Sequence, residues 1–160
     1  MAEQDTLNVK VEGPTPSWPI IFVKNYELIE HTADIGIKVK GVDLKDLFKN
    51  TASAMFDIIA QRIENRGQRT EKINIKLKSD DREQLFINWL NELLSLSATK
   101  ELIFSDFQIH KLDRNNLDAT LIGRAIKGYK VNTEIKAATY HELKLKQDKS
   151  GWEAEVIFDV

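Results

Sequence analysis

Three acidic groups near the two ends of the chain could bind a metal ion. Asp34 stands just before an expected strand, and Asp159 precedes Val160, whose α-carboxylate would add a second acidic group at that end. Hard cations such as Ca²⁺ and Mg²⁺ prefer carboxylate and carbonyl oxygens. If a strand holds Asp159 and Val160 in place, a divalent cation would neutralise their mutual repulsion. The alternatives are an Asp34 that only stabilises a turn and a tail that frays in solvent.

Residues of the preceding strand are expected beside Asp159. Two strand-like runs end the chain, and the turn at 148–151 between them predicts a hairpin. Counting outward from that turn places Asp159 opposite Tyr140 to within about two residues, with Thr139 and His141 next to it. Because a slip of one residue would exchange the two faces, the pattern does not decide between Tyr140 and His141.

His31 and Lys136 each have a functional and a simpler interpretation. His31 lies three residues before Asp34 and could bind the metal, orient a carboxylate by a hydrogen bond, or serve only the fold. A hard cation favours oxygen ligands, which argues against direct ligation by His31. Lys136 could meet a phosphate or an acidic partner, whereas most lysines on a sheet simply face solvent.

Composition limits the classes of function. The sequence has 160 residues, a formal net charge of -2 and no cysteine. The length suits a single domain, and the absence of cysteine excludes disulfides, thiolate metal sites and a cysteine nucleophile. Proteins that mainly bind nucleic acid are usually basic, so contact with RNA is expected to be indirect. The apolar run at 19–23 is too short to span a membrane and the acidic start is unlike a signal peptide, so we expect a soluble cytoplasmic protein with no membrane partner.

Hydrophobic periodicity predicts an α+β fold. Prolines at 14, 16 and 19 indicate an N-terminal extension over 1–24, either an arm or an edge strand at 20–23, before a domain over 25–160. A largely antiparallel β-sheet with two α-helices packed on one face is expected. Its predicted elements are a strand at 35–39, a helix from Asp43 to about 60, a strand at 73–77, a helix from Asp80 or Asp81 with apolar positions over 85–97, strands at 104–112 and 117–123, and a hairpin of 134–145 with 152–160.

Five segments carry a family pattern. They are HTADIG at 31–36, Leu47-Phe48 with AMF at 54–56, WLNELL at 89–94, EIKAATYH at 134–141 and VIFDV at 156–160. In this order they resemble the archease family over residues 26 to 160. The chain departs from the family at Gly123, where Arg124 follows instead of the usual acidic residue.

The resemblance implies an accessory protein, not an enzyme. Archeases activate the RtcB-type RNA ligase of tRNA splicing by promoting its guanylylation and its multiple turnover. The resemblance also implies a metal site of Asp34, Asp159 and Val160, with Ca²⁺ as the first candidate and Mg²⁺ or Mn²⁺ as alternatives. Two other functions stay open: a stand-alone metal-dependent phosphoester hydrolase, for which the chain has no glycine-rich phosphate loop, and a general chaperone-like module.

Overall fold

The computed structural model describes residues 26–29, 33–63 and 69–160. His31 and the predicted extension over 1–24 lie outside these residues. The helices and strands are β1 (Tyr26–Ile29), β2 (Ile35–Gly41), α1 (Leu44–Ile59), β3 (Ala60–Arg62), β4 (Thr70–Lys78), α2 (Arg82–Lys100), β5 (Leu102–Leu112), β6 (Asn116–Ala125), the 3-10 helix η1 (Ile126–Gly128), β7 (Tyr129–Val131), β8 (Ala137–Asp148) and β9 (Gly151–Asp159).

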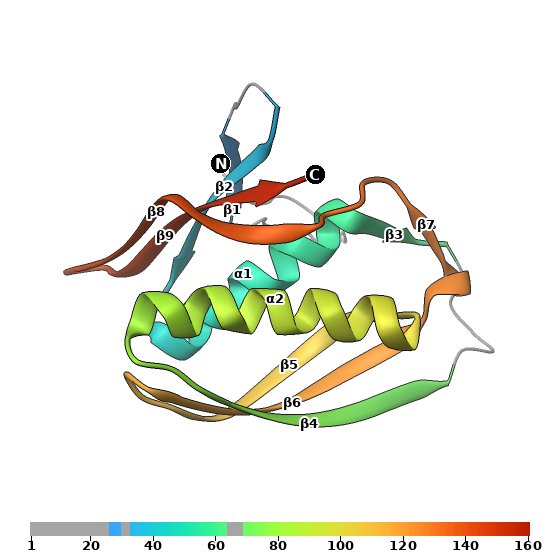
Figure 1. The fold of residues 1–160 in the computed structure, drawn as a ribbon, viewed down its shortest axis with the longest axis horizontal. Helices are drawn as coiled ribbons and strands as arrows, with labels where there is room; N and C mark the ends of the chain where they lie inside the picture. The colour runs from blue at the N-terminus through green and yellow to red at the C-terminus, as the bar shows by residue number, and fades with distance from the viewer. Residues whose placement is uncertain (1–25, 30–32, 64–68) are drawn as a thin grey trace, which may run out of the picture.

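The described strands pair antiparallel, in three sheets instead of one. The orders are β1-β2-β9-β8, β3-β7 and β4-β6-β5. The helices lie between the two larger sheets, as Figure 1 shows. α1 contacts β2 and β9 on one side and β5 on the other, and α2 contacts β8, β4 and β5. The α+β prediction with two helices is therefore confirmed, with the strands divided so that each larger sheet turns one face to the helices.

Both helices begin where their capping residues predict. The Asp43 carboxylate accepts the backbone N–H of Asp46 at 2.8 Å, and the Asp81 carboxylate accepts that of Gln84 at 2.8 Å. Each bond satisfies one of the N–H groups that the first helical turn leaves without a partner. Of the two aspartates considered for the second helix, the N-cap is Asp81.

Large apolar side chains from both helices and from β5 fill the space between the sheets. Trp89, Phe48, Phe86 and Phe107 are at most 1% exposed. The Trp89 indole N–H, buried with its ring, donates to the Phe48 carbonyl at 3.0 Å, which avoids the cost of an unpaired buried donor. No helix in the described part of the chain is both long and apolar enough to cross a bilayer.

Candidate functional site

The ends of β2 and β9 bring the two predicted metal-binding aspartates together. In the antiparallel pairing of these strands Ile35 stands opposite Phe158. Extending this register by one residue sets Asp34 directly beside Asp159. Asp34 is half-buried, and Asp159 and Val160 are exposed. Segments from opposite ends of the sequence thus meet at one edge of the four-stranded sheet.

Strand β9 is held on both sides up to this point. On the side away from β2, Asp159 pairs with Ala137 of β8, and the backbone N–H of Lys136 donates to the Asp159 carbonyl at 2.8 Å. The Lys136 side chain is exposed. Because pairing on two sides fixes the backbone, the final strand positions its acidic residue instead of fraying.

The predicted hairpin register is wrong at this end, because of a bulge. From the turn to the pair Lys144–Glu155 the two strands match residue for residue, but the next pair is Thr139–Ile157. Residues 140–143 of β8 therefore stand opposite a single residue of β9, and the partner of Asp159 moves three residues earlier than Tyr140. Bulges add such extra residues and bend the strand that carries them.

The bulge takes two of the expected neighbours away from Asp159. Tyr140 is 55% exposed, and its pKa is raised, first by desolvation and second by the charge of Asp81 at the start of α2. The His141 Nε2 atom lies 3.1 Å from a carboxylate oxygen of Glu142. Thr139 stays close to the candidate site, since its hydroxyl donates to the Ile157 carbonyl at 2.9 Å.

The donor atoms at this edge suit a hard cation. Two carboxylates and the main-chain carbonyl oxygen of Val160 are all oxygen donors, the type that Ca²⁺ and Mg²⁺ prefer. Among the described residues no three His, Asp or Glu side chains gather closely enough to hold a metal. Since Ca²⁺ takes about 6–8 oxygens, a cation here would draw further ligands from water or from a partner.

Asn91 of α2 supports this edge and was not singled out from the sequence. Its side-chain N–H₂ donates to the Ala138 carbonyl at 3.1 Å, and its oxygen accepts the Ala138 N–H at 2.8 Å. The side-chain amide thus gives β8 the two hydrogen bonds that a neighbouring strand would otherwise give. The sequence signal that could have identified Asn91 is an asparagine inside the largely apolar WLNELL segment.

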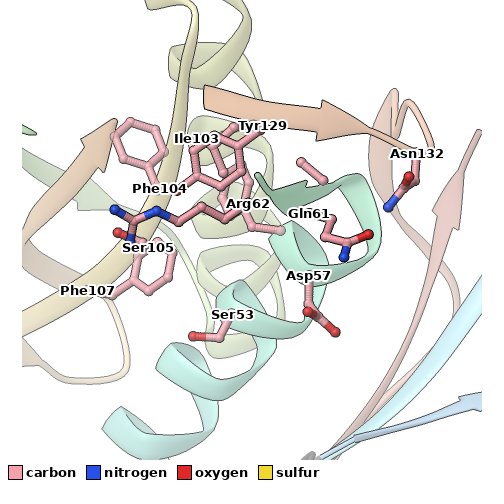
Figure 2. A pocket seen from close by; sticks show the side chains of 12 residues that line it. Ser53, Asp57, Gln61, Arg62, Ile103, Phe104, Ser105, Phe107, Tyr129 and Asn132 are labelled. Atoms are coloured by element: carbon pink, nitrogen blue, oxygen red, sulfur yellow. The ribbon is translucent and has the colours of Figure 1, made fainter. Parts of the chain in front are cut away.

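A separate pocket lies beside the C-terminal end of α1 (Figure 2). It has a volume of about 510 Å³ and is lined by the rings of Phe56, Phe104 and Phe107 together with polar side chains that include Asp57 and Arg62. Figure 2 shows Arg62 extending from β3 toward the phenylalanine side of the pocket. None of the residues predicted to bind a metal lines this pocket.

Asp57, which lines the pocket, also holds the start of β1 in place. The Tyr26 hydroxyl donates to the Asp57 carboxylate at 2.5 Å. Burial and this carboxylate, in that order, raise the pKa of Tyr26 well above its usual value, so the phenol stays neutral and keeps its proton for the hydrogen bond.

Comparison with known proteins decides the family. The model of the Archease protein family (MTH1598/TM1083) matches residues 26–160. This chain belongs to the archease family. It is 34% identical to the protein archease of Methanosarcina barkeri over 143 residues, which cover 86% of this chain and 97% of that protein. It is 33% identical to the protein archease of Pyrococcus furiosus over 147 residues, covering 86% and 100%.

Two solved structures share the archease fold with this chain. The solution structure of protein 1598 from Methanobacterium thermoautotrophicum superimposes with a TM-score of 0.67 at 30% identity, covering 86% of this chain and 100% of that one. The crystal structure of an archease from Thermotoga maritima, described as a possible chaperone, gives a TM-score of 0.60 at 27% identity, covering 82% and 94%. The α+β architecture is therefore the fold of the family.

Proposed function

We propose that this archease is an accessory protein, not an enzyme, that activates an RtcB-type RNA ligase in tRNA splicing. Its role would be to promote guanylylation of the ligase and its multiple turnover, with RNA reached through the ligase. The observation that carries the proposal is the meeting of Asp34 and Asp159. These residues come from two of the segments that give the chain its family pattern, and β2 and β9 bring them to one edge.

A divalent cation is proposed at that edge, with Ca²⁺ first and Mg²⁺ or Mn²⁺ as alternatives. Asp34, Asp159 and a main-chain oxygen of Val160 would hold it. The all-oxygen donor set supports a hard cation over a transition metal that prefers nitrogen or sulfur. Because Asp159 and Val160 are exposed, the ligase could complete the coordination, and the nearby Lys136 could meet a phosphate. The proposed site of action is the cytoplasm.

The test is a ligation time course with RNA in excess over the ligase, so that product beyond one equivalent reports turnover. Asp34→Asn and Asp159→Asn keep the size of each side chain and remove its charge. Both should lower the stimulation by about tenfold or more, the scale at which loss of groups supporting a metal site is felt. Glu71→Gln is the matched control, since Glu71 is exposed on β4 in the other large sheet. Full stimulation by Asp34→Asn would contradict the metal role.

Cation binding can be measured without the ligase. A ligand that binds only the folded protein stabilises it by about 2.7 kcal/mol at a concentration of 100 times Kd. Millimolar Ca²⁺ should therefore raise the Tm of the unchanged protein and of Glu71→Gln, and should not raise that of Asp159→Asn. Equal shifts in all three proteins would remove Asp159 from the proposed ligand set.

A general chaperone-like role is the second candidate, because the Thermotoga maritima relative is described as a possible chaperone. It predicts that the protein suppresses light scattering by several unrelated aggregating clients. Suppression confined to the ligase would favour the accessory role. Turnover of simple phosphoesters by the purified protein, abolished in Asp159→Asn, would instead indicate a hydrolase.

A further inference from the structure

The three-stranded sheet turns one face away from both helices. In Figure 1, β4, β6 and β5 lie below α2, and their opposite face has no element of the described chain across it. On β4 the side chains of this outer face are exposed, as at Lys72, Asn74 and Lys76, whereas Ile73 and Ile75 between them are half-buried toward the helices. The alternation is that of a strand with one covered face and one solvated face.

Positive charge collects on this outer face. The register sets Lys72 beside Ile122, and Lys76 and Lys111 on either side of Asp118. The cationic residues of the face are Lys72, Lys76, Lys78, Lys111 and Arg124, and its acidic residues are Asp106 and Asp118. Five cations against two carboxylates give the face a charge of about +3, although the whole chain carries -2. Beyond about 8 Å, the screening length at physiological salt, the acids elsewhere on the molecule have little effect here.

The lysines of the other large sheet are arranged differently. There Lys146 lies 3.3 Å and Lys38 4.0 Å from carboxylate oxygens of Glu153, and Lys144 lies 3.9 Å from one of Glu155. None of the ion pairs within 4 Å found among the described residues involves Lys72, Lys76 or Lys111. Lys72, Lys76 and Lys111 are thus not held in close ion pairs and are available to an external anion.

Hydrogen-bonding groups occupy the middle of the face. Thr120, 9% exposed, donates to the side-chain oxygen of Asn74 at 2.6 Å and lies 2.7 Å from His110 Nε2. Within the described strands β4, β5 and β6, no Phe, Tyr or Trp side chain points outward on this face, and its one ring is the His110 imidazole, which lies against Thr120. Proteins that bind unpaired bases stack successive bases on several aromatic rings, and a single imidazole does not provide such a row. A helical RNA, recognised through its phosphates and 2′-hydroxyls, needs only cations and hydrogen-bonding groups.

The spacing suits contact with several phosphates at once. Strands rise about 3.3 Å per residue and lie about 4.8 Å apart. Lys72 and Lys76 are therefore roughly 13 Å apart along β4, and Lys76 and Lys111 roughly 10 Å apart across β6. The positive groups form a flat array in two dimensions instead of a single row.

We propose that the outer face of the β4-β6-β5 sheet binds the sugar–phosphate backbone of a double-helical RNA segment. The choice of RNA among polyanions rests on the proposed function, which sets this protein beside an RNA ligase. The cationic face itself does not depend on that function. Binding is weak and insensitive to base sequence, in the range of about 10⁻⁴–10⁻⁶ M expected for contacts to phosphate alone, and it orients a bound stem without selecting it.

The test measures binding by fluorescence anisotropy of a labelled RNA duplex of about two helical turns, with the full chain and no ligase. The test variant is Lys72→Gln/Lys76→Gln/Lys111→Gln. The control, Lys38→Gln/Lys144→Gln/Lys146→Gln, removes the same charge from the other large sheet. Three phosphate contacts give a salt slope of about -2.7, so the unchanged protein should bind about 40-fold more weakly at 200 mM than at 50 mM salt. The test variant should bind at least tenfold more weakly at 50 mM salt, and the control should bind within twofold of the unchanged protein.

Several outcomes would overturn the proposal. They are no duplex binding at 100-micromolar protein in low salt, equal losses in the two triple variants, and tighter binding to single-stranded RNA of the same length than to the duplex. Lysines on an exposed edge strand also protect against aggregation. If that is their only role, the test variant will aggregate while its binding per folded molecule stays unchanged, which also refutes the proposal. Should the triple variant fail to fold, Lys72→Gln and Lys111→Gln are measured singly, each expected to lower the salt slope by about one.

Failure of this proposal and failure of the proposed function are separable. Duplex binding is measured without the ligase, and ligase stimulation is tested at Asp34 and Asp159 on a different sheet. The test variant should lose duplex binding and still stimulate the ligase fully on an RNA that has no stem. That result supports both proposals.

Discussion

Replacing Asn91 by alanine should loosen the start of β8 and lower the stability of the whole domain. The Asn91 side chain makes both hydrogen bonds of the Ala138 backbone to α2, at 3.1 and 2.8 Å. Ala138 is only 4% exposed, so water reaches its freed N–H and carbonyl groups poorly. The substitution therefore removes two hydrogen bonds and leaves two buried polar groups without partners.

The size of the effect follows from these losses. Each hydrogen bond contributes about 1 kcal/mol net, and an unpaired buried group costs about 1–3 kcal/mol. The higher helix propensity of alanine returns roughly 0.5 kcal/mol. The cost of the two unpaired groups already includes the lost bonds, so the free energy of unfolding should fall by about 2–5 kcal/mol, which for a domain of this size lowers Tm by roughly 4–20 °C.

Urea unfolding followed by tryptophan fluorescence measures this loss, and an unchanged m value shows that the difference is one of stability. Asn88→Ala is the matched control, because Asn88 lies on the same helix and makes one side-chain hydrogen bond, to Ser79 at 3.0 Å. The gain in helix propensity is common to both variants and cancels in their difference. Hydrogen exchange of the Lys136 N–H, which donates to Asp159, should quicken only in Asn91→Ala. Differences below about 0.5 kcal/mol lie within the usual departure of mutational effects from additivity. A smaller difference in unfolding free energy between Asn91→Ala and Asn88→Ala would therefore refute the argument for Asn91.

Two further predictions test other parts of the fold. Gly41→Ala should destabilise the protein by about 1–3 kcal/mol in the same urea assay, because an added Cβ would lie 2.4 Å from the Leu47 backbone nitrogen. A change of less than about 0.5 kcal/mol in the unfolding free energy would contradict this, since it would mean that the start of α1 shifts to make room for the methyl group. The Asp113 carboxylate accepts the backbone N–H groups of its own turn, and these bonds lower its pKa below the usual value of 3.8. The charged carboxylate should therefore stabilise the turn above pH 3.8, and this stabilisation should be lost as the pH falls through the lowered pKa. Side-chain NMR titration of Asp113 measures this, and a midpoint at or above 3.8 would contradict it.

Local signals in the sequence predicted most of the elements. Asp43 and Asp81 cap the two helices because a short acidic side chain satisfies the first backbone N–H groups, a relation that spans three residues. The alternation at 152–158 predicted the face of β9 that is buried, and Ala154, Val156 and Phe158 are fully buried. The short strands β1, β3 and β7 carry three or four residues each, too few for a period to stand out.

The tertiary structure alone decided which residues flank Asp159. The bulge over 140–143 shifts its partner from Tyr140 to Ala137, and Glu142, at a φ of 52° without being glycine, gives no sequence signal of the bend. The division of the strands into sheets was likewise not local, since β2 pairs with β9 across nearly the whole chain. That pairing is favoured because it buries the apolar faces of both strands against α1, an energy that exists only when distant segments have met. The sequence by itself determined the residue types that could bind a cation and the elements that carry them, and packing determined which of those residues lie side by side.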